Sequence, residues 1–120
     1  MTQNFNFDTV PALIGGDWSP ASSITVDEIP DPGTGETIAQ LPYSSVEEVD
    51  RAVIAAKAAF TEWSETPVPQ RTQVMFRFKR LLEDCEEELA ELITLENGKT
   101  LADARGEVRR GIEVVDFSCN

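Results

Sequence analysis

The sequence predicts an α/β fold in which short antiparallel strands, over residues 12–41, precede four helices, over residues 46–118. Apolar and polar residues alternate in the first part, which is typical of half-buried strands. From residue 46 onward apolar residues recur every three or four positions, the spacing of one helix face. Residues 1–11 are polar and irregular, and we expect them to form a mobile arm.

Turn signals divide the strand region. Residues 12–14 are a short apolar segment, and the following Gly15-Gly16-Asp17 predicts a tight hairpin turn, because glycine adopts positive φ easily. Residues 24–29 and 36–41 alternate with period two, and the Pro- and Gly-rich residues 30–35 between them predict a turn. We therefore expect small antiparallel strands that are marginal in isolation.

Helix starts and stops are marked in the second part. Ser45 and Glu48 form an S-x-x-E capping box, and Pro69 suits the first turn of a second helix. The acidic residues 86–88 favour the start of a third helix through the helix dipole, and Asn97-Gly98 predicts its end.

A fourth helix is expected from about Thr100. Its apolar face comprises Leu101, Ala104, Val108, Ile112 and Val115. This pattern continues to Phe117 without a cap or a Gly/Pro stop, so we expect the sequence to stop within a helix and to be a piece of a longer protein. The alternative is a complete small domain with a frayed final helix.

Acidic residues outnumber basic ones 22 to 10, which gives a formal net charge of −12. Such a surface repels phosphate backbones and anionic lipid, so we expect neither nucleic acid nor membrane as a partner. The N-terminus lacks a basic segment followed by an apolar one, which makes the cytoplasm the expected location. The charge suggests either adaptation to high salt or an ordinary acidic protein.

The residue types for most catalytic centres are missing. The sequence contains no histidine, which excludes Ser-His and Cys-His pairs and most zinc-site patterns. Cys85 lies among acidic residues that disfavour the thiolate, and we expect it to pack on a helix face in reduced form. Cys119 has no nearby base. We therefore assign no catalytic residue to this chain.

Two glycine-containing segments resemble cofactor loops without matching them. Gly33-Thr34-Gly35 lacks the third glycine and the following helix of a dinucleotide cradle. Gly98-Lys99-Thr100 ends like a phosphate loop, but Ile93 occupies the position of the upstream glycine, so a helix cap is the better interpretation. We assign no cofactor-binding residue.

Carboxylates spaced by four, such as Glu83 with Glu87 and Asp103 with Glu107, are expected to share helix faces that contact solvent. Phe60 and Phe78 fall on apolar stripes and are expected to pack in the core rather than to bind a ligand.

Five segments, in order, resemble the N-terminal region of the aldehyde dehydrogenase superfamily. They are Leu13-Ile14-Gly15-Gly16-Asp17-Trp18, Asp31-Pro32-Gly33-Thr34-Gly35-Glu36, residues 49–60, Arg71, and Leu95-Glu96-Asn97-Gly98-Lys99. Within the superfamily, residues 106–115 are most similar to the methylmalonate-semialdehyde dehydrogenase branch. The resemblance implies that residues 12–120 are the N-terminal piece of an NAD-binding domain.

The resemblance also implies a parent enzyme about four times longer, usually a homo-oligomer, that binds NAD or NADP. In such enzymes a cysteine attacks an aldehyde, hydride passes to the cofactor, and a thioester forms. In the suggested branch the acyl group passes to coenzyme A. The family's catalytic and cofactor motifs match no position here, so we expect the piece alone to be inactive and its partner to be the rest of its own enzyme.

One site residue pair is carried over from the resemblance. Some family members hold a monovalent cation between a backbone carbonyl before the Pro-Gly turn and a carboxylate on the fourth helix. In this sequence these groups are the Ile29 carbonyl and Glu107, although Glu107 also fits an ordinary surface charge. Two other readings of the whole chain remain, a free-standing acidic helical binding module and an inactive remnant.

Overall fold

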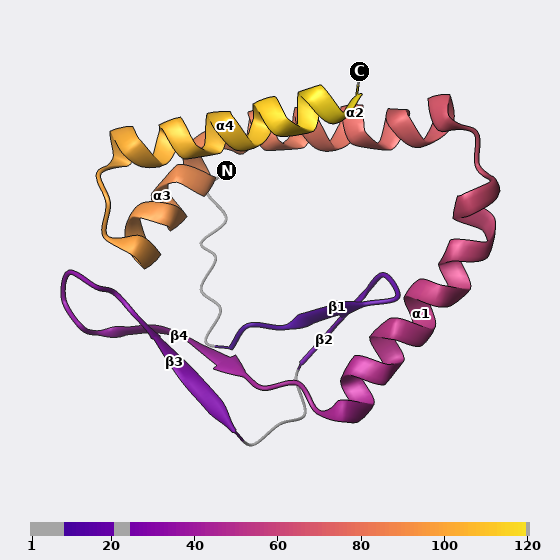
Figure 1. Ribbon diagram of the computed structural model, residues 1–120. Helices are drawn as coiled ribbons and strands as arrows, with labels where there is room; N and C mark the ends of the chain where they lie inside the picture. The colour runs from indigo at the N-terminus through magenta and orange to yellow at the C-terminus, as the bar shows by residue number, and fades with distance from the viewer. Residues whose placement is uncertain (1–8, 21–24, 120) are drawn as a thin grey trace. The chain divides into compact units, whose positions relative to one another are not determined.

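The computed structural model describes residues 9–20 and 25–119 of the chain. These residues form short antiparallel strands followed by helices, which confirms the predicted α/β class (Figure 1). The chain divides into two compact units, residues 1–62 and residues 63–120. The strand pairings lie in the first unit, and the pairing of α2 and α3 with α4 lies in the second.

The first hairpin joins β1 (Ala12–Ile14) to β2 (Asp17–Ser19). The two strands are antiparallel, with Leu13 opposite Trp18. Gly15 and Gly16 connect them with φ of 65° and 95°, a conformation that a side chain would oppose. The predicted glycine turn is confirmed, except that Asp17 already belongs to the second strand.

The second hairpin joins β3 (Val26–Pro30) to β4 (Thr37–Pro42), with Ile29 opposite Ala39. Asp31 closes the connecting turn, because its carbonyl accepts the Gly35 amide at 2.7 Å and its Oδ1 accepts the Gly33 amide at 2.7 Å. The start of the predicted strand at residue 24 lies outside the described residues.

An additional segment pairs with β4. Thr9 forms a parallel bridge with Gln40, and the Val10 amide donates to the Gln40 carbonyl at 2.9 Å. The described end of the predicted arm is therefore hydrogen-bonded to the hairpin. Residues 1–8 lie outside the described residues, and their mobility stays a prediction.

The helix α1 spans Val46–Glu65 and begins at the predicted capping box. The Ser45 amide donates to Oε2 of Glu48 at 2.8 Å, and the Glu48 amide donates to Oγ of Ser45 at 3.2 Å. Two amide donors at the helix start are thereby satisfied. Glu48 is the buried residue of this helix, at 5% exposure.

The remaining helices are α2 (Val68–Asp84), α3 (Glu86–Asn97) and α4 (Leu101–Cys119). Gly98 ends α3 with φ of 75° and donates its amide to the Thr94 carbonyl at 2.9 Å, as predicted. Thr100 caps α4, because its Oγ1 accepts the Asp103 amide at 3.2 Å. Pro69 occupies the first turn of α2, also as predicted.

The core of the second unit lies along α4. Ala90 and Ala104 are completely buried, Val108 and Ile112 are nearly so, and partly buried residues surround them: Leu82, Leu89, Ile93 and Leu101. The predicted apolar face of the fourth helix is therefore confirmed. Both α2 and α3 pack against α4, which runs beside them (Figure 1).

Three packing predictions are wrong within the described residues. Phe60 is 65% exposed and Phe78 is 45% exposed, although both lie on apolar stripes. Cys85 is exposed at the junction of α2 and α3 rather than packed on a helix face. The physical reason is that a helical stripe is buried only where another element covers it, and α2 has no buried residue.

No helix among the described residues is long and apolar enough to span a bilayer.

Candidate functional site

The two predicted cation ligands lie in different units. Ile29 is in β3, opposite Ala39, at the point where the pairing of the hairpin becomes irregular. Glu107 is on α4, where Nζ of Lys99 lies 2.7 Å from its Oε2 and Arg110 lies 3.9 Å from its Oε1. The Glu107 carboxylate thus already has a lysine as counter-ion. Its role in binding a cation stays a prediction.

The segment that resembles a phosphate loop has other partners. The Gly98 amide is used to cap α3, and the Lys99 ammonium is bound by Glu107. The cap interpretation is confirmed. Gly33 and Gly35 lie in the turn that leads into β4, a strand, and not into a helix. These residues do not fit a dinucleotide cradle, which needs amides at a helix N-terminus.

The densest group of charges surrounds the junction between α2 and α3. Five of the six residues from Glu83 to Glu88 are acidic. Two of these carboxylates pair with bases one turn earlier on α2: Lys79 with Glu83 at 3.6 Å and Arg80 with Asp84 at 3.9 Å. Such exposed pairs within one helix stabilise it only slightly.

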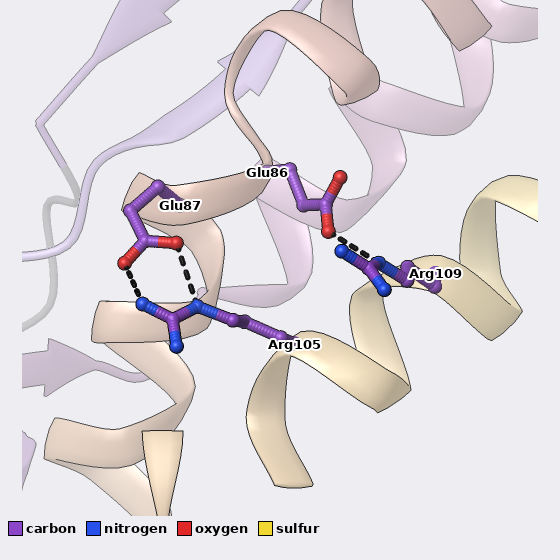
Figure 2. Close-up of polar contacts among 4 residues, drawn as sticks. All are labelled: Glu86, Glu87, Arg105 and Arg109. Carbon is purple, nitrogen blue, oxygen red and sulfur yellow. Dashed lines mark hydrogen bonds and ion pairs between the residues drawn. The ribbon is translucent and has the colours of Figure 1, made fainter. Parts of the chain in front are cut away.

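Two further carboxylates bind arginines of α4 (Figure 2). The Arg105 guanidinium donates two hydrogen bonds to the Glu87 carboxylate, and the one from Nε to Oε2 is 2.8 Å long. Arg109 donates its Nε to Oε1 of Glu86 at 2.8 Å. The hydrogen bond from Arg105 lowers the pKa of Glu87 below its ordinary value. These contacts join α3 to α4, and the paired residues are 18 and 23 positions apart in the sequence.

Of the two carboxylate pairs predicted to share helix faces, one lies on separate helices and the other on a single helix. Glu83 and Glu87 lie on separate helices because the chain breaks at Cys85, so that prediction is wrong. Asp103 and Glu107 do lie on one helix, but Thr100 donates to Asp103 at 2.7 Å and Lys99 binds Glu107.

A third contact between helices joins α2 to α4. Nζ of Lys79 donates to Oδ1 of Asp116 at 2.6 Å, and this hydrogen bond raises the pKa of Lys79 above its ordinary value. Sequence reasoning missed all three contacts between helices. Spacing along one helix predicts neighbours on that helix, whereas these partners meet only after the helices pack.

The second hairpin carries polar contacts of its own. The Tyr43 hydroxyl donates to Oδ2 of Asp27, which raises the pKa of Tyr43, and the Thr37 hydroxyl donates to Glu28 at 3.0 Å. A hollow of about 280 Å³ is lined by residues 37–40, and none of them is titratable. It therefore offers no ionisable acid or base.

Both cysteines lie among the described residues, and the sequence contains no histidine. No group of three or more His, Cys, Asp or Glu side chains is placed among the described residues to hold a metal ion. Cys85 and Cys119 are both free thiols. What the described part of the chain provides is a capped, ion-paired scaffold.

A family model described as "Aldehyde dehydrogenase family" matches residues 18–120. Among curated relatives, malonate-semialdehyde dehydrogenase 1 of Oceanobacillus iheyensis is 56% identical over 105 residues, which are 88% of this chain and 22% of that protein. Malonate-semialdehyde dehydrogenase 2 of Geobacillus thermodenitrificans is 52% identical over 110 residues, 92% of this chain and 23% of that protein.

Solved structures give the same picture. Methylmalonate-semialdehyde dehydrogenase of Oceanimonas doudoroffii matches with a TM-score of 0.90 and 40% identity over 95% of this chain and 23% of that one. Aldehyde dehydrogenase C of Pseudomonas syringae, in complex with NAD+ and octanal, matches with a TM-score of 0.87 and 37% identity over 91% of this chain and 23% of that one. The chain spans under a quarter of the length of the relatives it matches.

Proposed function

The chain belongs to the aldehyde dehydrogenase family, and from this we propose that it is the N-terminal scaffold of an NAD-dependent semialdehyde dehydrogenase of the malonate or methylmalonate type. The observation that carries the proposal is identity of 52% and 56% to malonate-semialdehyde dehydrogenases across about nine-tenths of the chain.

The proposed division of labour follows from the contacts. The described residues are engaged in caps and ion pairs, and the glycine segments do not fit a dinucleotide cradle. We therefore assign cofactor binding and the attacking cysteine to the remaining three-quarters of the relatives' length. In the proposed enzyme NAD would supply the hydride acceptor for oxidation of the aldehyde. Coenzyme A as acyl acceptor is part of this proposal, supported by the similarity to the methylmalonate-semialdehyde branch.

The cation site at Ile29 and Glu107 is a separate part of the proposal. It is supported by the chemistry of its two groups, a backbone carbonyl near a turn and a carboxylate on α4, because both are oxygen ligands suited to hard cations. Anomalous scattering from crystals soaked in a heavier monovalent ion tests it. A peak beside Glu107 supports the site, and its absence at full soaking removes it.

Three properties of the parent enzyme complete the proposal: homo-oligomeric assembly, a cytoplasmic location and adaptation to high salt. The last rests on the net charge of −12. Thermal melts of the chain at low and molar salt test the adaptation. A melting temperature that rises with salt supports it, and equal melting temperatures contradict it.

A chimeric enzyme tests the scaffold role. The matched N-terminal 22% of the Oceanobacillus relative is replaced by this chain, and NADH formation is followed with malonate semialdehyde. We expect a folded, active chimera because 56% of the matched positions are identical. The chain alone serves as the inactive control.

The outcomes separate the proposal from its rivals. A chimera that folds as the relative does but forms no NADH contradicts the scaffold role and favours a free-standing binding module. Omission of coenzyme A in the same assay tests the acyl acceptor, since a coenzyme A-dependent enzyme then loses turnover after the first thioester forms.

A further inference from the structure

The junction between α2 and α3 is a single non-helical residue. Cys85 has φ of −106° and ψ of 11°, away from the helical values near −63° and −42°. Cys85 is at once the C-cap of α2 and the N-cap of α3: its amide donates to the Leu81 carbonyl at 3.1 Å, and its carbonyl accepts the Leu89 amide at 3.0 Å. The two helices therefore meet at this one residue, where the chain bends (Figure 1).

The local sequence contains no residue that forces this bend. Sharp kinks come mainly from proline, glycine pairs or inserted side chains, and residues 82–88 contain neither proline nor glycine. The junction is instead rich in negative charge, with acidic residues on both sides of Cys85. In a continuous helix Glu83 would stack on Glu87, and Asp84 on Glu88, and like charges at this spacing repel each other.

The basic side chains that contact carboxylates near the junction fall into two classes. Lys79 and Arg80 neutralise carboxylates on their own helix, at four-residue spacing. Lys79 in addition donates to Asp116 of α4 at 2.6 Å. Arg105 and Arg109 neutralise carboxylates of a different helix, and both of their partners lie in the first turn of α3, directly after the bend (Figure 2). The second class of contacts ties α3 to α4.

The apolar packing of α3 on α4 centres on small side chains, with Val108 and Ile112 nearly buried beside them. Among the described residues no large side chain is fully buried, and the fully buried contacts of α3 and α4 are the two small residues Ala90 and Ala104. A contact of this size leaves a larger share of the orientation to the ion pairs than a dense core would.

We propose that the α2–α3 junction is a charge-latched hinge. Cys85 is the hinge, repulsion among the surrounding carboxylates acts to open it, and Arg105 and Arg109 of α4 latch α3 in its bent orientation. The inference rests on the second unit alone and does not depend on the enzymatic role proposed above.

Spin-label distances across the hinge test this proposal. Labels are attached at Gln73→Cys and Glu96→Cys in the 120-residue chain with Cys85→Ser and Cys119→Ser, because both labelled positions are exposed on α2 and α3. A straight continuous helix would separate their Cα atoms by about 35 Å, at 1.5 Å per residue. We expect one short, narrow distance in the latched chain.

Removal of the latch in Arg105→Ala with Arg109→Ala should broaden the distribution and extend it toward that limit. Two exposed ion pairs shift such an equilibrium by roughly fivefold, so the long-distance population should rise about fivefold. The matched control is Arg80→Ala with Arg110→Ala, which removes the same two charges from pairs within single helices. The control should keep the short distance.

A charge exchange covers the case in which the double variant does not fold. Arg105→Glu alone should open the hinge, and the addition of Glu87→Arg should restore the short distance by rebuilding the pair in reverse. The proposal is overturned if the control opens as far as the latch variant, if the folded latch variant keeps the short distance, or if the exchanged pair fails to restore it.

Discussion

Ser45 and Glu48 cap α1 reciprocally, each accepting the other's backbone amide with a side-chain oxygen at 3.2 Å and 2.8 Å. Replacement Ser45→Ala removes one of these acceptors and should lower the free energy of unfolding by about 1 kcal/mol. Urea denaturation measures the change. Ser45→Thr should retain most of the stability, and Glu47→Gln, in the same turn but outside the box, is the matched control. Equal losses in Ser45→Ala and Ser45→Thr would show that the hydroxyl is not the cause.

Replacement of Gly98 and of Gly111 by alanine should change the stability of the chain in opposite directions. Gly98 has φ of 75°, where a Cβ costs roughly 1–2 kcal/mol, so Gly98→Ala should destabilise the chain. Gly111 lies inside α4 with nothing within 4 Å of an added Cβ, so Gly111→Ala should stabilise it by about 0.5–1 kcal/mol through the unfolded chain. Thermal melts of the two variants compare them directly. Changes of the same sign would contradict this reading of the two backbones.

Thr94 carries a buried hydroxyl oxygen without a hydrogen-bond partner among the described residues. Thr94→Val keeps the shape and removes the unsatisfied group, so it should leave stability unchanged or raise it by about 1 kcal/mol. The control is Thr72→Val, whose hydroxyl donates to Val68 at 2.8 Å and whose loss should not stabilise. A clear loss of stability in Thr94→Val, measured by urea denaturation, would mean that the hydroxyl has a partner.

Tyr43 is the single tyrosine of the sequence, so its ionisation can be followed by absorbance without a contribution from a second tyrosinate. The hydrogen bond to Asp27, and then the charge of Asp27, raise the pKa of Tyr43 above its ordinary value. A raised folded-state pKa means that this stabilisation is present below the ordinary tyrosine pKa and is lost as pH rises through the folded value. Asp27→Asn should shift the titration to lower pH, and Asp17→Asn should not. An unchanged midpoint in Asp27→Asn would exclude this pairing.

The Glu87–Arg105 pair should make the second unit sensitive to acid. The pKa of Glu87 is lowered by the arginine, so the stabilisation exists above the ordinary glutamate pKa and is lost as pH falls through the folded value. Carbon-13 NMR of the side-chain carboxyl measures this pKa directly. Arg105→Ala should raise it, whereas Arg110→Ala should leave it in place. The stability difference between the wild-type chain and Glu87→Gln should also vanish at low pH.

Local signals in the sequence predicted much of the fold. The capping box at Ser45, the Asn97-Gly98 stop and the Gly15-Gly16 turn are each decided by groups within four residues, and each appears where it was expected. The apolar face of α4 was also predictable because its period is regular.

Side-chain burial and contacts between helices were not predictable from local signals, because they depend on which elements pack together. The stripe containing Phe60 has helical periodicity, yet periodicity says nothing of whether a partner covers it, and the side chain is 65% exposed. The hydrogen bonds from Arg105 to Glu87 can form only after α3 has packed on α4. The same holds for the break at Cys85, which divided a carboxylate pair expected on one face.

The short connections within each unit have a consequence for synthesis of the chain. β1 and β2 are separated by two residues, and α3 and α4 by residues 98–100, so these partners leave the ribosome almost together. Loop closure over so few residues is fast, and contacts of low sequence separation form early in folding. Each hairpin and the α3–α4 pair can thus take shape during translation, soon after its second element is synthesised.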